Sequence, residues 1–200
     1  MGETKPLGRP REFDEDDALA TILDAFWKQG FAGTSMSDLV AATDLRKGSL
    51  YAAFGDKHAM YLKALALYEA TAVEGAFALL TGPGAPLERL DQFLSLPITV
   101  IAEAKDRRGC FLCNASVDQA LLDPETERAV KAGFRRLARG LEAALSELAV
   151  GKQRAGQVKA QAQHLLSVYF GLRVMAKGGQ SVKALTEAKR AALDGLLAGA

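Results

Sequence analysis

Apolar residues recur at intervals of three and four along nearly the whole chain, which is the spacing of one face of an α-helix. The first such face carries Leu19, Ile22, Leu23 and Phe26, and Gly30 follows it. No stretch alternates apolar and polar residues between turn signals, as a half-buried β-strand would. The pattern therefore predicts an all-α fold of about nine helices.

The N-terminal part of the chain has the proportions of a helix-turn-helix unit. Asp14 is a candidate N-cap of a long first helix, which is expected to end at Gly30. Ser35 and Asp38 have the spacing of a capping box, which starts a short second helix. A third short helix is expected over residues 47–54. A long helix followed by two short helices with a turn between them predicts this unit.

Longer helices are expected in the rest of the chain. Their ranges are 57–80, 87–107, 110–121, a segment that begins after Asp123, 155–177 and 181–198. Pro97 should kink the second of them. The helix over 155–177 is apolar on almost every side, so other elements must cover it from several directions. The expected parts are a flexible basic arm (1–12), a helix-turn-helix domain (13–56) and a larger helical domain (57–200).

Composition narrows the class of protein. The chain has 200 residues, a formal charge of +1 and 49% hydrophobic residues, which excludes a disordered or collagen-like chain. Two cysteines cannot build a disulfide scaffold. No apolar run approaches the roughly 20 residues that span a bilayer, and no secretory signal is visible. We therefore expect a cytoplasmic protein that does not bind membranes.

Residues 30–39 (GFAGTSMSDL) and 45–57 (LRKGSLYAAFGDK) resemble the DNA-binding domain of the TetR family of transcriptional repressors, within a match that runs from Asp14 to Met60. The resemblance implies a homodimer that leaves a palindromic operator when a small-molecule effector binds its helical C-terminal domain. Repressor and activator roles both stay open. A helical small-molecule binding protein without DNA activity is the alternative from another class. No catalytic constellation or metal cluster is visible, so we expect no enzyme, cofactor or metal.

The third helix of such a domain enters the major groove. Arg46 and Lys47 would donate to guanine, Ser49 would donate or accept, and Gly48 would allow a close approach. The hydroxyl of Tyr51 would contact a phosphate. These residues form the predicted base-reading surface.

Further phosphate contacts are expected beside this helix. Thr34 and Ser35 stand at the start of the second helix, and Lys57 stands at the start of the fourth. The chain departs from the family pattern at Arg46, where a small hydroxyl residue usually caps the recognition helix, and at Ala53, where an aromatic or His is common. Arg46 therefore becomes a candidate specificity residue.

The N-terminal 63 residues do not carry an excess of positive charge. Residues 1–63 carry eight basic and ten acidic side chains, a net charge of −2, which is not the balance of a simple basic DNA-binding domain. Arg9 and Arg11 lie in an arm that resembles the Gly-Arg-Pro core found in A·T-rich minor grooves. A solvated tail is the alternative for this arm.

The larger domain is expected to hold the effector pocket and the dimer interface. Candidate pocket residues are Phe93, Cys110, Phe111, Cys113, Asn114, Phe134, His164, Tyr169 and Arg173. Ordinary core packing is the alternative for each aromatic residue. The helices over 155–177 and 181–198 each present a face of Leu and small residues, and pairing with a second copy would make a four-helix bundle.

Cys110 and Cys113 form a C-x-x-C pair that follows Arg107, Arg108 and Gly109. A helix N-terminus and nearby arginines would stabilise a thiolate, so the pair could serve as a redox or electrophile sensor of the same regulator. Two buried apolar thiols are the alternative reading. Zinc is not expected, because only two histidines could complete the site.

Overall fold

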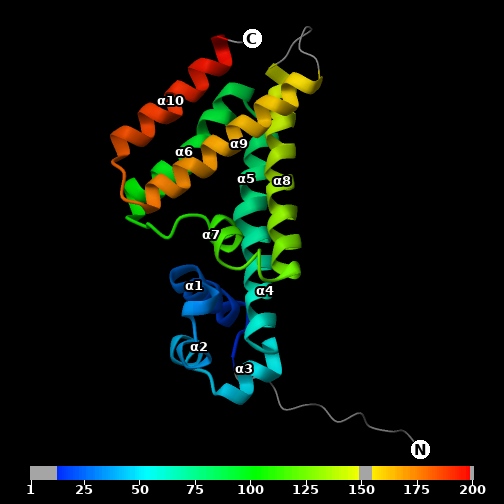
Figure 1. Cartoon of the computed structure of the whole chain (residues 1–200), viewed down its shortest axis with the longest axis vertical. Coiled ribbons are helices and arrows are strands. Elements are labelled where there is room, and N and C mark those ends of the chain that lie inside the picture. The colour runs from blue at the N-terminus through cyan, green and yellow to red at the C-terminus, as the bar shows by residue number, and fades with distance from the viewer. Residues whose placement is uncertain (1–12, 149–154, 199–200) are drawn as a thin grey trace, which may run out of the picture.

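The computed structural model describes residues 13–148 and 155–198. Its helices are α1 (Glu15–Gly33), α2 (Met36–Thr43), α3 (Lys47–Phe54), α4 (Lys57–Tyr68), a π-helical turn (Glu69–Val73), α5 (Glu74–Thr81), α6 (Pro86–Ala104), α7 (Phe111–Asp118), α8 (Pro124–Leu148), α9 (Ala155–Lys177) and α10 (Val182–Ala198) (Figure 1). Because α4, the π turn and α5 form one rod, the described part of the chain has nine helices and no strand. The all-α prediction is confirmed.

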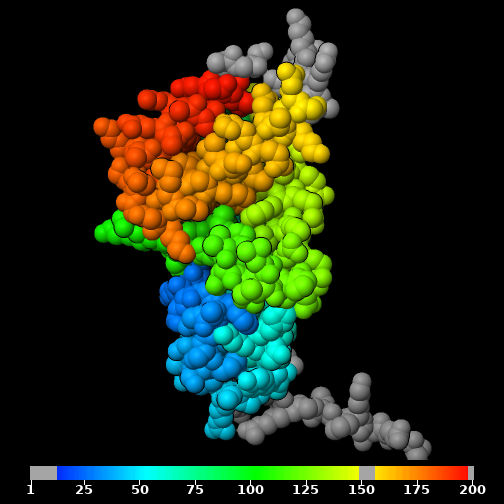
Figure 2. Space-filling view, viewed as in Figure 1, coloured from blue at the N-terminus to red at the C-terminus, as the bar shows by residue number. Residues whose placement is uncertain are grey.

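The helices form two connected bodies (Figure 1). One body consists of α1, α2 and α3, which we call the reader. The rod rises from the reader beside α8 toward α6, α9 and α10, and α7 lies where the two bodies meet. In Figure 2 the two bodies are in direct contact along this side of the molecule. This arrangement places the reader at one end and the largest helices at the other.

Local signals in the sequence set most helix starts. Asp14 accepts hydrogen bonds from the amides of α1, and Ser35 and Asp38 form the expected capping box of α2. The prediction for the end of α1 was incomplete. Gly30 leaves the helical conformation with a φ of 73°, which suits glycine, but the helix resumes for one turn to Gly33.

Two helices differ from their predicted ranges. α6 begins at Pro86, is helical on both sides of the buried Pro97, and ends at Ala104 because Lys105 adopts the left-handed conformation. α7 is shorter than expected, with Cys110 as its N-cap and Asp118 as its last residue. The segments between α6, α7 and α8 are therefore longer than the pattern indicated.

The core runs without a break from the reader into the larger body. Ile22 and Phe26 of α1 belong to the same buried cluster as Leu50 of α3 and Tyr61 of α4, and this cluster continues to Leu165 of α9. No separate core divides the reader from the rest of the described residues. Movement of one body must therefore be accommodated by the other.

The rod Lys57–Thr81 is, among the described residues, the one helix long and apolar enough to cross a membrane. Its length and composition alone give that result. In this fold Met60, Leu65, Val73 and Leu80 of the rod are buried in the core. Its apolar side chains are thus used in packing against α1 and α8.

Leu50 anchors α3 to the rest of the reader, because its side chain is completely buried. Replacing Leu50 by Ala should lower the free energy of unfolding by about 2–5 kcal/mol through lost burial and a cavity. Urea unfolding followed by circular dichroism measures this change. Tyr51→Phe is the control, since Tyr51 is 42% exposed and should unfold like the wild type. Equal stability of both variants would contradict the assigned packing.

Candidate nucleic-acid interface

The turn between α2 and α3 sets the direction of the third helix. Asp44 ends α2 in the left-handed conformation with a φ of 55°, and α3 begins at Lys47. Leu50 and Phe54 are buried in the core, and Leu39 of α2 belongs to the same cluster. α3 is therefore held by one face, and its opposite face is free to contact another molecule.

The free face of α3 carries most of the predicted base-reading residues. Arg46, Lys47, Gly48 and Tyr51 are exposed, and Ser49 is half-buried. The ammonium of Lys47 lies 5.9 Å from the centre of the Tyr51 ring, so both side chains occupy the same side of the helix. The structure brings these residues together on one surface.

The start of α3 carries no side-chain cap. Arg46 is the N-cap residue, and its side chain makes no capping hydrogen bond, while its carbonyl oxygen accepts from the amides of Ser49 and Leu50. A helix start without a side-chain acceptor suits an external anion such as a phosphate oxygen. Arg46 at this position thus leaves the first amides of α3 without a side-chain acceptor.

The expected phosphate contact from the side chain of Thr34 is wrong. Thr34 is completely buried, and its hydroxyl donates to the carbonyl oxygen of Gly30 at 2.7 Å. Its amide also donates within the chain, to Phe31. Ser35 is exposed, but its amide donates to Asp38 at 2.7 Å. Of the donors that belong to these two residues, only the hydroxyl hydrogen of Ser35 is left for a phosphate.

Basic side chains beside α3 are held by aromatic rings. The ammonium of Lys57 lies 4.3 Å from the centre of the Phe31 ring, and that of Lys63 lies 5.5 Å from the Phe54 ring. Lys63 also donates to the carbonyl oxygen of Ala53 and was not among the predicted contacts. The predicted minor-groove residues, Arg9 and Arg11, lie outside the described residues.

The reader's sequence and the whole fold match known regulators. Residues 18–64 match the family model described as bacterial regulatory proteins, tetR family. Over these residues the reader is a TetR-family DNA-binding domain. That family and this fold are those of transcriptional regulators, which are not enzymes.

Two curated relatives match different shares of this chain. The uncharacterized HTH-type transcriptional regulator YezE of Bacillus subtilis (strain 168) is 27% identical over 122 residues, which are 61% of this chain and 63% of that protein. The HTH-type transcriptional repressor ComR of Escherichia coli (strain K12) is 41% identical over 64 residues, 32% of this chain and 30% of ComR. The chain thus matches less than two thirds of the length of either relative.

A solved TetR-family structure matches nearly the whole chain. It is a cysteine-substituted variant of the regulator CifR, complexed with 26 bp of double-strand operator DNA. The TM-score is 0.78 and the sequence identity 28%, over 93% of this chain and 98% of that chain. The similarity therefore includes the larger body as well as the reader.

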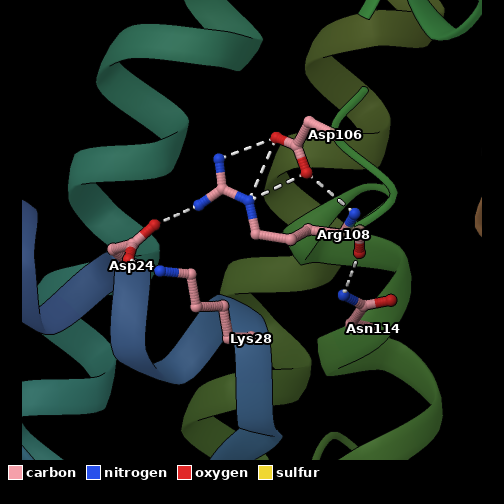
Figure 3. A network of polar contacts seen from close by, with 5 residues as sticks. All are labelled: Asp24, Lys28, Asp106, Arg108 and Asn114. Atoms are coloured by element: carbon pink, nitrogen blue, oxygen red, sulfur yellow. Dashed lines mark hydrogen bonds and ion pairs between the residues drawn. The ribbon is translucent and has the colours of Figure 1, made fainter. Parts of the chain in front are cut away.

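A polar joint connects α1 of the reader to the segment that precedes α7, and nothing in the sequence pattern indicated it (Figure 3). The guanidinium of Arg108 is paired with Asp106 at 2.7 Å and with Asp24 of α1, and it lies 4.2 Å from the centre of the Trp27 ring. The Asn114 side chain donates to the carbonyl oxygen of Arg108 at 3.0 Å. Hydrogen bonds from Arg108 lower the pKa of Asp106, so both charges persist in the joint.

A second contact of this joint lies at the bend of α1. The carboxylate of Asp118, at the end of α7, accepts from the amide of Phe31 at 3.0 Å. A side chain at Gly30 would meet the same carboxylate, because a Cβ atom there would lie 2.7 Å from it. The bend at Gly30 thus brings the amide of Phe31 to this carboxylate, and it leaves no room for a side chain at residue 30. Sequence spacing offered no signal for it, since the partners are 87 residues apart.

The two cysteines lie at the start of α7 in a polar environment. Cys110 is buried, and the Tyr68 hydroxyl donates to its sulfur at 3.4 Å. Hydrogen bonds from Cys113 and Tyr68, with the positive charge of Arg173, lower the pKa of Cys110 to about 6 despite burial. The hydrogen bond with Cys110, together with burial, raises the pKa of the Cys113 thiol. Within this pair, Cys110 is the thiol favoured as thiolate.

Most other predicted pocket residues are packed against one another. Phe93 stacks on Tyr169 with ring centres 4.2 Å apart, and Phe134 lies 4.6 Å from Phe170. Phe111 belongs to an aromatic cluster with Trp27, Tyr61 and Tyr68. These rings fill the interior of the TetR-type larger body.

The polar pocket candidates are divided. Arg173 donates to the Tyr169 hydroxyl at 2.7 Å, and Asn114 accepts from Lys177 at 2.8 Å, so both lie near the cysteines. His164 is exposed on α9, so the described residues do not enclose it.

Two cavities among the described residues lie away from most of these side chains. One, of about 470 Å³, lies between α6 and α10 and is lined in part by Asp91 and Leu193. Another, of about 10 Å³, is lined in part by Arg107, Gly109 and Arg173. The second cavity admits only a molecule of about the size of water.

Lys47 is the sharpest test of the base-reading surface. Replacing Lys47 by Ala should reduce discrimination between operator and altered operator by about 1–3 kcal/mol, because a contact to guanine is lost. Binding titrations with both DNAs measure the ratio of affinities. Lys131→Ala is the matched control, since Lys131 lies on α8 and pairs with Glu127. An unchanged ratio in the Lys47 variant would show that another residue reads the bases.

Proposed function

We propose that the protein is a homodimeric TetR-type repressor that binds a pseudo-palindromic operator and leaves it when a small-molecule effector binds. The observation that carries this proposal is the free face of α3, where Arg46, Lys47 and Tyr51 are exposed while Leu50 and Phe54 are buried. A helix held by one buried face can place its exposed face in the major groove while its packing on the reader core stays unchanged. The CifR variant bound to operator DNA supports the same use of the fold.

In this proposal the parts of the chain have separate tasks. Residues 13–56 bind DNA, and residues 57–200 bind the effector and form the dimer. The arm over residues 1–12 adds contacts in the minor groove through Arg9 and Arg11. The rod carries changes between the two bodies, because it belongs to the core of both.

The dimer interface is proposed on α9 and α10. Val174 and Met175 of α9 are 61% and 39% exposed, and Val182 and Leu197 of α10 are 41% and 53% exposed. Large apolar side chains on neighbouring helices suit a partner that covers them. A two-fold pairing of both helices makes a four-helix bundle and fixes the distance between two copies of α3.

Effector release is proposed to act through the joint. The pairs formed by Arg108 and Asp118 hold α1 against α7 in one orientation. An effector that binds more tightly to another orientation of α7 shifts the reader with it. DNA affinity then falls because the two copies of α3 no longer match the operator spacing.

A thiol switch is the second candidate for the input signal. The observation that favours it is the hydrogen-bonded pair of Cys110 and Cys113, in which the positive charge of Arg173 favours the Cys110 thiolate. In this candidate the Cys110 thiolate attacks hydrogen peroxide, breaks the O–O bond and becomes a sulfenic acid, and the hydroxide takes up a proton to leave as water. The Cys113 thiol then attacks that sulfur and releases a second water, leaving a disulfide.

The cysteine pair stands next to the joint. Cys110 lies two residues after Arg108, which pairs with Asp24 of the reader. A disulfide at the start of α7 would therefore strain the joint directly.

A salt titration of operator binding tests the DNA-binding proposal. The logarithm of the association constant should fall linearly with the logarithm of the salt concentration. The slope should be roughly −0.9 per phosphate contacted, because cations bound to the DNA are released. Lys57→Ala should reduce the slope by about 1. Lys131→Ala, which changes charge on α8, should leave the slope unchanged. The absence of saturable DNA binding would favour a small-molecule binding protein of the same fold.

The thiol switch predicts that oxidation, rather than salt, reversibly abolishes operator binding. Peroxide should release the wild-type protein from its operator, and dithiothreitol should restore binding. Cys110→Ser and Cys113→Ser should each abolish this reversible release, since neither variant can form the disulfide. Fluorescence anisotropy with labelled operator measures the fraction bound. Reversible release of either variant by peroxide, at the wild-type concentration, would rule the switch out and leave non-covalent effectors.

A further inference from the structure

Three ligand-type side chains meet at the boundary between α4 and α8. The imidazole Nε2 of His58 lies 2.9 Å from an Asp123 carboxylate oxygen, and its Nδ1 lies 4.0 Å from Glu125. One ligand atom from each of the three residues can be chosen so that all lie within 4.8 Å of one another. In the described part of the chain this is the one such group of histidine and carboxylates.

Asp123 is held in place by its neighbours. One of its carboxylate oxygens accepts from the amide of Thr126 at 3.0 Å and from its hydroxyl at 2.5 Å, and the other accepts from the amide of Glu125 at 3.2 Å. Thr126 is completely buried. Metal-binding carboxylates are commonly oriented by hydrogen bonds of this kind.

His58 is also oriented before any ligand arrives. Its ring stands edge-on to Phe31 at 6.4 Å between centres. Its side chain is 35% exposed and that of Glu125 is 55% exposed, so a hydrated ion can reach both. Glu125 has one other charged partner, Arg128, at the long distance of 3.8 Å. This carboxylate can therefore turn from the Nδ1 side of the imidazole toward the Nε2 side, where a cation shared with Asp123 would lie.

We propose that His58, Asp123 and Glu125 form a binding site for a divalent transition-metal cation. Imidazole and carboxylate ligands hold such cations at about 2.0–2.2 Å, and two ligands at a right angle are then about 2.9 Å apart. This separation is the one observed between His58 and Asp123. Water completes the coordination on the exposed side. The cation takes the place of the proton that joins His58 to Asp123.

A cation at this place ties two distant parts of the fold together. His58 lies in the first turn of α4, directly after α3, whereas Asp123 and Glu125 begin α8. The site therefore spans the reader side and the larger body, beside the contact of Asp118 with Phe31. Binding should resist any movement that separates these two ends.

Cobalt(II) is a suitable probe, since it is paramagnetic and accepts these ligands. The full-length protein in dithiothreitol-free buffer is titrated with cobalt chloride alone and followed by proton NMR of its two histidines. Saturable binding of one ion per chain should shift or broaden the His58 resonances and leave those of His164 sharp. No saturable binding, or equal effects on both histidines, would overturn the proposal and leave a simple ion pair.

Matched variants separate this site from others on the chain. His58→Gln should weaken cobalt affinity at least about tenfold, and Glu125→Gln should also weaken it, while both keep the fold by circular dichroism. Glu127→Gln is the control, because Glu127 lies in the same turn of α8 and pairs with Lys131. His164→Gln should bind cobalt like the wild type. Wild-type affinity in both the His58 and Glu125 variants would assign the ion to another site.

Discussion

The structure depends on an aromatic cluster that crosses from the reader into the larger body. Tyr61 of the rod lies 5.1 Å from Phe26 of α1 and 5.6 Å from Phe111 of α7, measured between ring centres. Tyr68 and Trp27 pack at 5.0 Å beside them. Because tightly packed rings transmit displacement, α1, the rod and α7 cannot move independently. The position of α3 is therefore linked to the packing of helices that do not touch DNA.

Polar contacts around this cluster fix how the reader is oriented relative to the larger body. Arg108, Asp118 and His58 each join a reader element or the start of the rod to a segment near α7 or α8. Charged contacts at partly exposed positions are easier to rearrange than a buried core. They are thus the contacts between the reader and the larger body that can change with the least disturbance of the aromatic core.

Short-range signals predicted much of the reader, and long-range contacts explain the errors. The capping box at Ser35 and the short helix over residues 47–54 follow from spacing within a few residues, and both were confirmed. Thr34 was misplaced because its hydroxyl turns back to the bend of α1. His164 faces outward because residues of α9 alternate between core and surface, which apolar composition alone concealed. The pairing of Arg108 with Asp24 joins residues 84 apart, so no local pattern could indicate it.

Selection of genomic DNA fragments by the full-length protein shows whether it recognises an operator as a dimer. Bound fragments are sequenced, and the number of chains on the best fragment is measured by light scattering. We expect a shared pseudo-palindrome with half-sites about one helical turn apart, or a multiple of that, and an even number of chains per site. Fragments without a common sequence, or a single chain on each site, would contradict a dimeric operator-binding regulator.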